Sequence, residues 1–149
     1  METKELTFEE IAELPKGTIL HDEFDEGIRF IIMRGPAAIC AYIGIAKDHP
    51  AAGHSYDDVP ISCHGGLTFA GEGDGKWRSK DYFWYGWDYG HSGDFAFYYL
   101  KDDNPPSYAK TGKKWTVKEV KDDSWSAIND FKKIVRICEK ASRRPMVKP

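Results

Sequence analysis

The pattern of apolar and polar residues predicts an antiparallel β-hairpin in the first third of the chain. Residues 28–33 and residues 38–45 are both rich in β-branched and aromatic side chains, which favour strands. The segment between them, "RGPA", contains glycine and proline, which suit a turn and interrupt a strand. We therefore expect two neighbouring strands joined by a tight connection.

A short amphipathic helix is predicted near the N-terminus, within residues 6–17. Thr7 and Glu10 have the spacing of a capping box, in which each side chain bonds to the backbone N–H of the other residue. Apolar residues recur on one helical side, and Pro15 and Gly17 then end the pattern.

A longer amphipathic helix is predicted over residues 122–141. One helical face collects its apolar residues, namely Trp125, Ile128, Phe131, Ile134, Val135 and Cys138. We expect this face to pack across the sheet. The last twenty residues carry seven Lys or Arg side chains, which complement the helix dipole and keep the outer face hydrated; contact with an anion is the alternative.

Between these ends, the sequence predicts strands separated by irregular segments. The expected strands are residues 61–72, 82–90 and 115–120, and the expected irregular segments are residues 46–60, 71–81 and 101–114. The predicted fold class is α+β: an antiparallel sheet packed against the C-terminal helix, with a short N-terminal helix. We expect a single domain over residues 1–149, with a basic C-terminal tail at about 141–149.

Composition supports this interpretation and excludes several classes of protein. The chain has 149 residues, of which 41% are hydrophobic and 30% charged, as in soluble globular domains. No apolar run approaches the roughly 20 residues that span a bilayer, and the N-terminus does not resemble a secretory signal, so we expect a cytoplasmic protein without a membrane partner. The net charge of −3 argues against broad binding of nucleic acid.

Three cysteines, Cys40, Cys63 and Cys138, lie far apart in apolar surroundings. This odd number and spacing suit buried reduced thiols better than a disulfide framework or a zinc site. We expect no metal and no other cofactor.

The first candidate constellation is "HGGLT", with His64, Gly65, Gly66 and Thr68. If these residues continue a strand, His64, Gly66 and Thr68 share one face, and glycine leaves room beside the imidazole for a ligand. The alternative is that the two glycines form a bend and His64 is a half-buried structural residue.

The second constellation is "WDYGHSGD", in which Asp88, His91 and Asp94 fall within seven residues. Carboxylates and imidazole at this spacing suit acid–base chemistry, a shared metal, or hydrogen bonds to ribose hydroxyls and amines. The spacing is no established metal signature. If the two predicted strands pair as antiparallel neighbours, His64 lies within a few ångströms of Asp88 or His91.

Aromatic residues are concentrated in the strand predicted at residues 82–90. Six of them follow closely: Tyr82, Phe83, Trp84, Tyr85, Trp87 and Tyr89. These are too many for one small hydrophobic face, so we expect some to line a pocket, to stack on a flat ligand or to close an oligomer interface. We expect Trp84 or Trp87 to form a wall of the ligand site, and we expect a homodimer or higher homo-oligomer.

Three stretches within roughly residues 38–94, "KDHPAAGHSYDDV", "HGGLTFAGE" and "WYGWDYGHSGD", together resemble a family of short uncharacterised bacteriophage and prophage proteins. The residues that match the family's motifs are His64, Gly65, Gly66, Leu67, Thr68, Asp88, His91, Gly93 and Asp94. Members often carry Cys-Ala where this chain has Tyr89 and Gly90, which disfavours a cysteine ligand or nucleophile there. The resemblance implies that His64, Asp88, His91 and Asp94 act together.

A phage setting favours proteins that block host defence. We therefore expect a binding protein that captures a small nucleotide-derived ligand, such as a host defence signal, by stacking its base and bonding its ribose or phosphates. The first alternative is a hydrolase of phosphodiester-like bonds, with His64 or His91 as acid–base and Asp88 or Asp94 either orienting that histidine or holding a metal ion. The second is a protein inhibitor of a host defence enzyme.

Overall fold

The computed structural model describes residues 5–143, with side chains through residue 138. Five antiparallel strands form one sheet in the order β1-β2-β3-β5-β4. They are β1 (Ile19–Asp25), β2 (Ile28–Arg34), β3 (Ile39–Ala46), β4 (Phe69–Glu72) and β5 (Tyr82–Asp88). The hairpin predicted from the sequence is confirmed as β2 and β3, and β4 pairs with β5 as expected.

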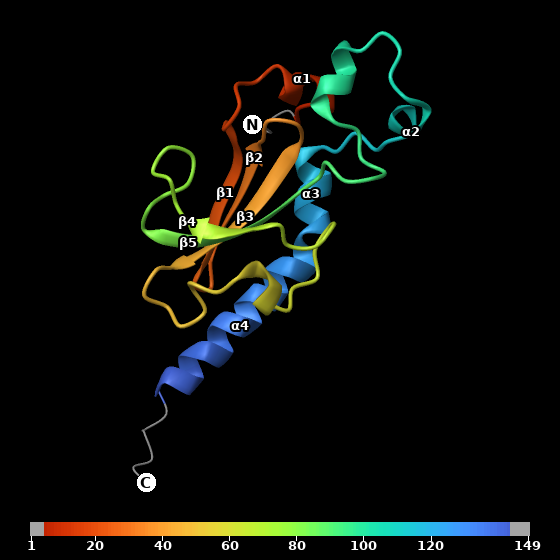
Figure 1. Cartoon of the computed structure of the whole chain (residues 1–149). Helices are drawn as coiled ribbons and strands as arrows, with labels where there is room; N and C mark the ends of the chain where they lie inside the picture. Colours follow the sequence, from red (N-terminus) through yellow and green to blue (C-terminus); the bar gives the residue numbers. More distant parts are fainter. Residues whose placement is uncertain (1–4, 144–149) are drawn as a thin grey trace.

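The helices are α1 (Phe8–Ala12), α2 (Ser107–Lys110), α3 (Val117–Asp123) and α4 (Trp125–Arg143), with 3-10 turns η1 (Tyr56–Asp58) and η2 (Phe97–Lys101). Figure 1 shows α4 crossing one side of the sheet, with its C-terminal end extending beyond the strands, while α1 and α2 lie toward the opposite end of the molecule. The α+β fold class is therefore confirmed. No helix within residues 5–143 combines the length and apolarity needed to cross a membrane.

The main core lies between α4 and the sheet. Phe131 and Val135 of α4 are fully buried against side chains such as Ile43 of β3 and Tyr85 of β5. Trp125 is 70% exposed, so its assignment to this face was wrong. It is the first residue of α4, and the buried positions at this end of the helix are Ser124 and Ala127 instead.

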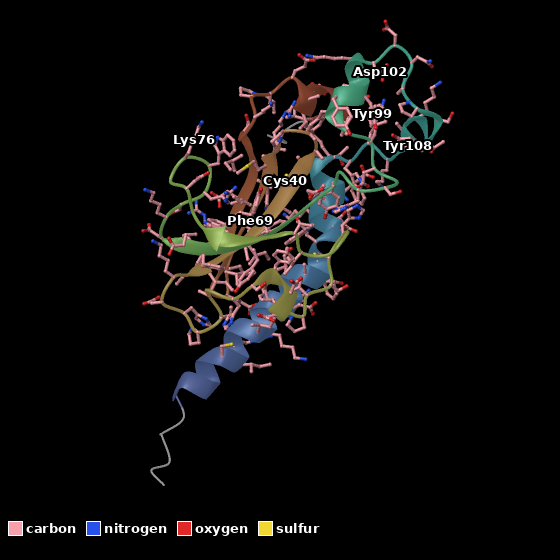
Figure 2. The ribbon with its side chains drawn as sticks, viewed as in Figure 1. Cys40, Phe69, Lys76, Tyr99, Asp102 and Tyr108 are labelled. Atoms are coloured by element: carbon pink, nitrogen blue, oxygen red, sulfur yellow. The ribbon has the colours of Figure 1, made fainter. Side chains whose placement is uncertain are left out.

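The other face of the sheet carries a smaller core, which residues 73–81 cover. We call this segment the strap. Ile31, Met33 and Trp84 are buried on this face, and the indole Nε1 of Trp84 donates to the carbonyl oxygen of Ser79 in the strap at 2.9 Å. Figure 2 labels Phe69 on the sheet and Lys76 in the strap.

The strand predicted at residues 115–120 is a helix. Thr116 and Glu119 form a capping box: the N–H of Glu119 donates to Thr116 Oγ1 at 3.3 Å, and the N–H of Thr116 donates to Glu119 Oε1 at 3.1 Å. These bonds satisfy N–H groups that the first helical turn leaves unpaired, so local capping outweighs the short β-like alternation.

The strand predicted at residues 61–72 is formed only at its end, in β4. Gly65 and Gly66 have φ of +69° and +79°, and the N–H of Gly66 donates to the carbonyl of Cys63 at 3.0 Å. This left-handed turn cannot continue a strand, so the argument that His64, Gly66 and Thr68 share a strand face was wrong. The expected basic tail lies outside the described residues from residue 144 onward.

Replacement of Thr116 by alanine should lower the free energy of unfolding by about 1 kcal/mol, because the first turn of α3 loses its capping hydroxyl. Thr116→Ser keeps the hydroxyl and should remain close to the wild type. Urea unfolding followed by circular dichroism measures both. Equal destabilisation by the two substitutions would contradict a role for the hydroxyl.

Candidate functional site

The Asp94 carboxylate is the centre of the candidate site. Its Oδ2 lies 2.7 Å from His64 Nε2 and accepts the backbone N–H of His91 at 3.0 Å. Its Oδ1 accepts the indole N–H of Trp115 at 2.8 Å. The Asp94 side chain is only 3% exposed, so these donors replace the water that a free carboxylate would bind.

Backbone bonds fix the position of Asp94 between two segments. The N–H of Lys113 donates to the carbonyl of Gly93, and the N–H of Phe95 donates to the carbonyl of Lys113, both at 2.8 Å. A Cβ at Gly112 would lie 2.8 Å from the Asp94 carbonyl oxygen. Glycine at residue 112 therefore allows the two backbones to approach this closely.

His64 is held by aromatic rings as well as by Asp94. Its ring stacks on Tyr89 with 4.6 Å between centroids and 11° between planes, and Trp115 contacts it edge-on at 5.1 Å. The Tyr89 hydroxyl donates to Asp123 Oδ2 at 2.8 Å, and burial raises the pKa of Tyr89. Because Nε2 is engaged with Asp94, Nδ1 is the nitrogen of His64 that remains for a further contact.

His91 packs directly over the turn that carries His64. A Cβ at Gly65 would lie 2.3 Å from atoms of the His91 ring, so only glycine leaves room for this contact. The rings of His64 and His91 are 5.9 Å apart between centroids. The prediction that the two motifs meet is thus confirmed, although a turn rather than a strand brings His64 there.

Asp88 lies at the edge of this cluster. Its Oδ1 accepts the N–H of Gly90 at 2.9 Å and is 3.5 Å from His91 Nε2, without the geometry of a hydrogen bond. Asp88 therefore closes the turn after β5 and places a negative charge beside His91.

A hollow of about 430 Å³ opens beside the loop that contains His91 and Asp94. Three tyrosines, Tyr98, Tyr99 and Tyr108, line it on the side of η2 and α2. The hydroxyls of Tyr99 and Tyr108 are 3.4 Å apart, and Figure 2 shows both residues in this region. Tyr98 and Tyr108 are 61% and 72% exposed, so both present aromatic surface.

The expectation that Trp84 or Trp87 walls the site was wrong, because both are buried at 1% exposure. Trp84 belongs to the core beneath the strap, and Trp87 belongs to the core beneath α4. Thr68 extends the pairing of β4 through its N–H, which donates to the carbonyl of Gly86 at 2.9 Å, and it does not line the hollow.

Sequence reasoning missed the aromatic residues that do belong to the site. Tyr89 was grouped with the strand aromatics, while Trp115, Tyr98, Tyr99 and Tyr108 lie in segments without a recognisable motif. Burial of Trp84, Tyr85, Trp87 and Tyr89 within one chain removes the aromatic excess that suggested a dimer. Self-association stays a prediction, which light scattering tests.

The described residues provide no cluster of metal ligands, and Cys40 and Cys63 are not reactive thiols. Across residues 5–138 no group of three or more His, Cys, Asp or Glu side chains is placed to hold a metal ion. Burial raises the pKa of both Cys40 and Cys63 to about 11, so these thiols are protonated at neutral pH and poor nucleophiles.

Comparison of the chain with protein-family models, with curated proteins and with solved structures gives no match. The site is therefore interpreted from its own geometry.

Two adjacent glycines provide a matched test of this geometry. Gly65→Ala and Gly66→Ala should each cost about 1–2 kcal/mol, because alanine is strained at positive φ. Only Gly65→Ala should also displace the His91 ring, since a Cβ at residue 66 meets nothing within 4 Å. NMR spectra of the histidine rings and urea unfolding separate the two effects. Unchanged His91 signals in Gly65→Ala would contradict the contact.

Proposed function

We propose that this chain binds a small nucleotide-derived ligand in the hollow beside His91 and Asp94 and sequesters it. The observation that carries the proposal is the pair of exposed tyrosines, Tyr98 and Tyr108, at the 430 Å³ hollow. Large exposed aromatic rings suit stacking on a flat base, and such stacking contributes about 1–3 kcal/mol per base.

Polar groups that also line the hollow suit the rest of such a ligand. Ser92, Asp94 and Thr111 line it together with the glycines of the loop after β5. Hydroxyl and backbone groups of this kind hydrogen-bond the edge of a base or a ribose hydroxyl, which fixes its orientation. The combination of apolar rings and a few fixed polar groups is typical of small-molecule sites.

The resemblance of "HGGLTFAGE" and "WYGWDYGHSGD" to phage and prophage proteins supports an accessory role against host defence. The proposed ligand is accordingly a nucleotide signal made by the host, and sequestration would lower its free concentration. His91 and Asp94 belong to this proposal because they line the hollow, and His64 belongs to it because it contacts Asp94 and supports its position.

Incubation of the protein with a panel of nucleotide signals, followed by removal of free ligand, heating and mass spectrometry, tests the proposal. Wild-type protein should release one panel member unaltered. Tyr108→Ala should bind it at least about tenfold more weakly, as expected for the loss of one stacking ring. Its stability should change by less than about 0.5 kcal/mol, because the side chain is exposed.

Tyr56→Ala is the matched control, since Tyr56 is 40% exposed and does not line the hollow. Equal binding by wild type and Tyr108→Ala would contradict the site. Release of nothing by the wild type would contradict the function and direct the search to a host protein as partner.

A second candidate, hydrolysis of the same class of ligand, is favoured by the 2.7 Å contact between His64 and Asp94. A carboxylate on one imidazole nitrogen orients the ring, so that the other nitrogen can accept a proton from an attacking water. Asp94 accepts three N–H groups and would orient the imidazole without accepting the proton itself.

For this candidate, the panel experiment should release a cleaved product, and His64→Gln should slow cleavage at least about 100-fold, the usual contribution of a general base. His54→Gln, in an exposed loop position, should cleave at the wild-type rate. Cleavage that survives His64→Gln would exclude His64 as the base.

A further inference from the structure

A second hollow, of about 280 Å³, adjoins the first at Tyr98. Tyr98 lines both hollows. Arg34 at the end of β2, Lys101 of η2 and Glu13 after α1 line the second one. The tyrosine-lined hollow and a hollow that contains two cations therefore share Tyr98.

Arg34 is an unusual cation because it is buried and its hydrogen bonds to described residues go to carbonyl oxygens rather than to a carboxylate. The residue is 8% exposed, and its guanidinium packs over the Phe97 ring at 4.2 Å. Its hydrogen bonds to described residues go to backbone carbonyls, including that of Ala12 at 2.8 Å and that of Pro36 at 3.1 Å. Within the part of the chain that the structure describes, its Nε has no hydrogen-bond partner. Carbonyl dipoles offset only part of a buried charge, so the site favours an anion nearby.

The first hollow, by contrast, offers no positive side chain of this kind. Among the described residues that line it, none is lysine or arginine. Charge-assisted hydrogen bonds from Lys and Arg are a strong way to recognise phosphate, and for a ligand stacked there such cations lie outside the hollow.

We infer that Arg34 and Lys101 form an anion subsite that takes the phosphate of a nucleotide whose base stacks on the tyrosines across Tyr98. This inference rests on the proposed function and names its ligand more closely: a phosphorylated nucleoside rather than a nucleoside or free base. Lys101 is exposed and can reach a bound phosphate, while the buried Arg34 supplies a fixed positive field.

Glu13 allows a test in which removal of a negative charge and removal of a positive charge should change phosphate binding in opposite directions. Its exposed carboxylate lines the same hollow and is near enough to raise the pKa of Arg34, against the larger lowering effect of burial. A negative charge there opposes a phosphate. Removal of Glu13 should therefore strengthen phosphate binding, whereas removal of Lys101 should weaken it.

The experiment is calorimetric titration of full-length protein, at low salt, with the four nucleoside 5′-monophosphates, the four matching nucleosides and inorganic phosphate. At least one monophosphate should bind the wild type about tenfold or more tightly than its nucleoside, the usual gain from one charge-assisted contact. Lys101→Gln should remove most of this advantage, and Glu13→Gln should increase it. Lys133→Gln, an equal charge change on an exposed part of α4, should leave it unchanged.

The two failures are distinguishable. If a nucleoside binds as tightly as its monophosphate and Lys101→Gln changes neither, the anion subsite is wrong and base binding stands. If inorganic phosphate binds with the expected responses to Lys101→Gln and Glu13→Gln while no nucleoside or monophosphate binds, the subsite stands and the proposed nucleotide function is wrong. If no probe binds, both are wrong. Both substituted side chains are exposed, so their loss leaves folding intact.

Discussion

The buried carboxylate of Asp94 is the interaction on which the candidate site depends. It joins the loop after β5 to the turn that carries His64 and to the segment that carries Trp115, and the backbone bonds between this loop and Lys113 support the same arrangement. A buried carboxylate is costly unless donors satisfy it, and here three N–H groups do so. This requirement fixes the side-chain directions of His64 and Trp115 and the path of the loop at His91. The hydrogen bonds that the buried Asp94 carboxylate accepts therefore fix the residues at the floor of the first hollow.

Most of the elements that could be predicted from the sequence are periodic. The hairpin of β2 and β3, the aromatic strand β5 and the helix α4 repeat their apolar residues over several turns or alternations, and the five-residue helix α1 was marked by its capping box. The edge strand β1 was missed because it is largely exposed and shows little alternation. The helix α3 was mistaken for a strand because a capping box, rather than the apolar pattern, determines the conformation of so short a segment. The strand β4 was predicted too long because two glycines at positive φ form a turn before it.

The site could be predicted in part for the same reason. Its polar residues lie in two compact motifs, and adjacency of strands in the sequence was enough to bring His64 close to His91. The aromatic residues of the site could not be identified from the sequence. Alternation along β5 shows which side chains share a face of the sheet, but it does not show which segment covers each face. The strap buries Trp84 on one face, and α4 buries Trp87 on the other. The exposed tyrosines come from η2 and α2, which no periodic pattern marks.

The distribution of fixed and exposed groups bears on the choice between capture and catalysis. Asp94 is fully engaged, and Tyr89 and Trp115 hold the His64 ring, so the polar side of the site is rigid in orientation. Catalysis by His64 requires its Nδ1 to lie close to an attacking water and to the ligand bond that is cleaved. The residues that line the first hollow include His91 and Asp94 but not His64. Capture requires less: aromatic surface, a few oriented polar groups and, across Tyr98, positive charge for an anionic group. We therefore propose sequestration ahead of catalysis.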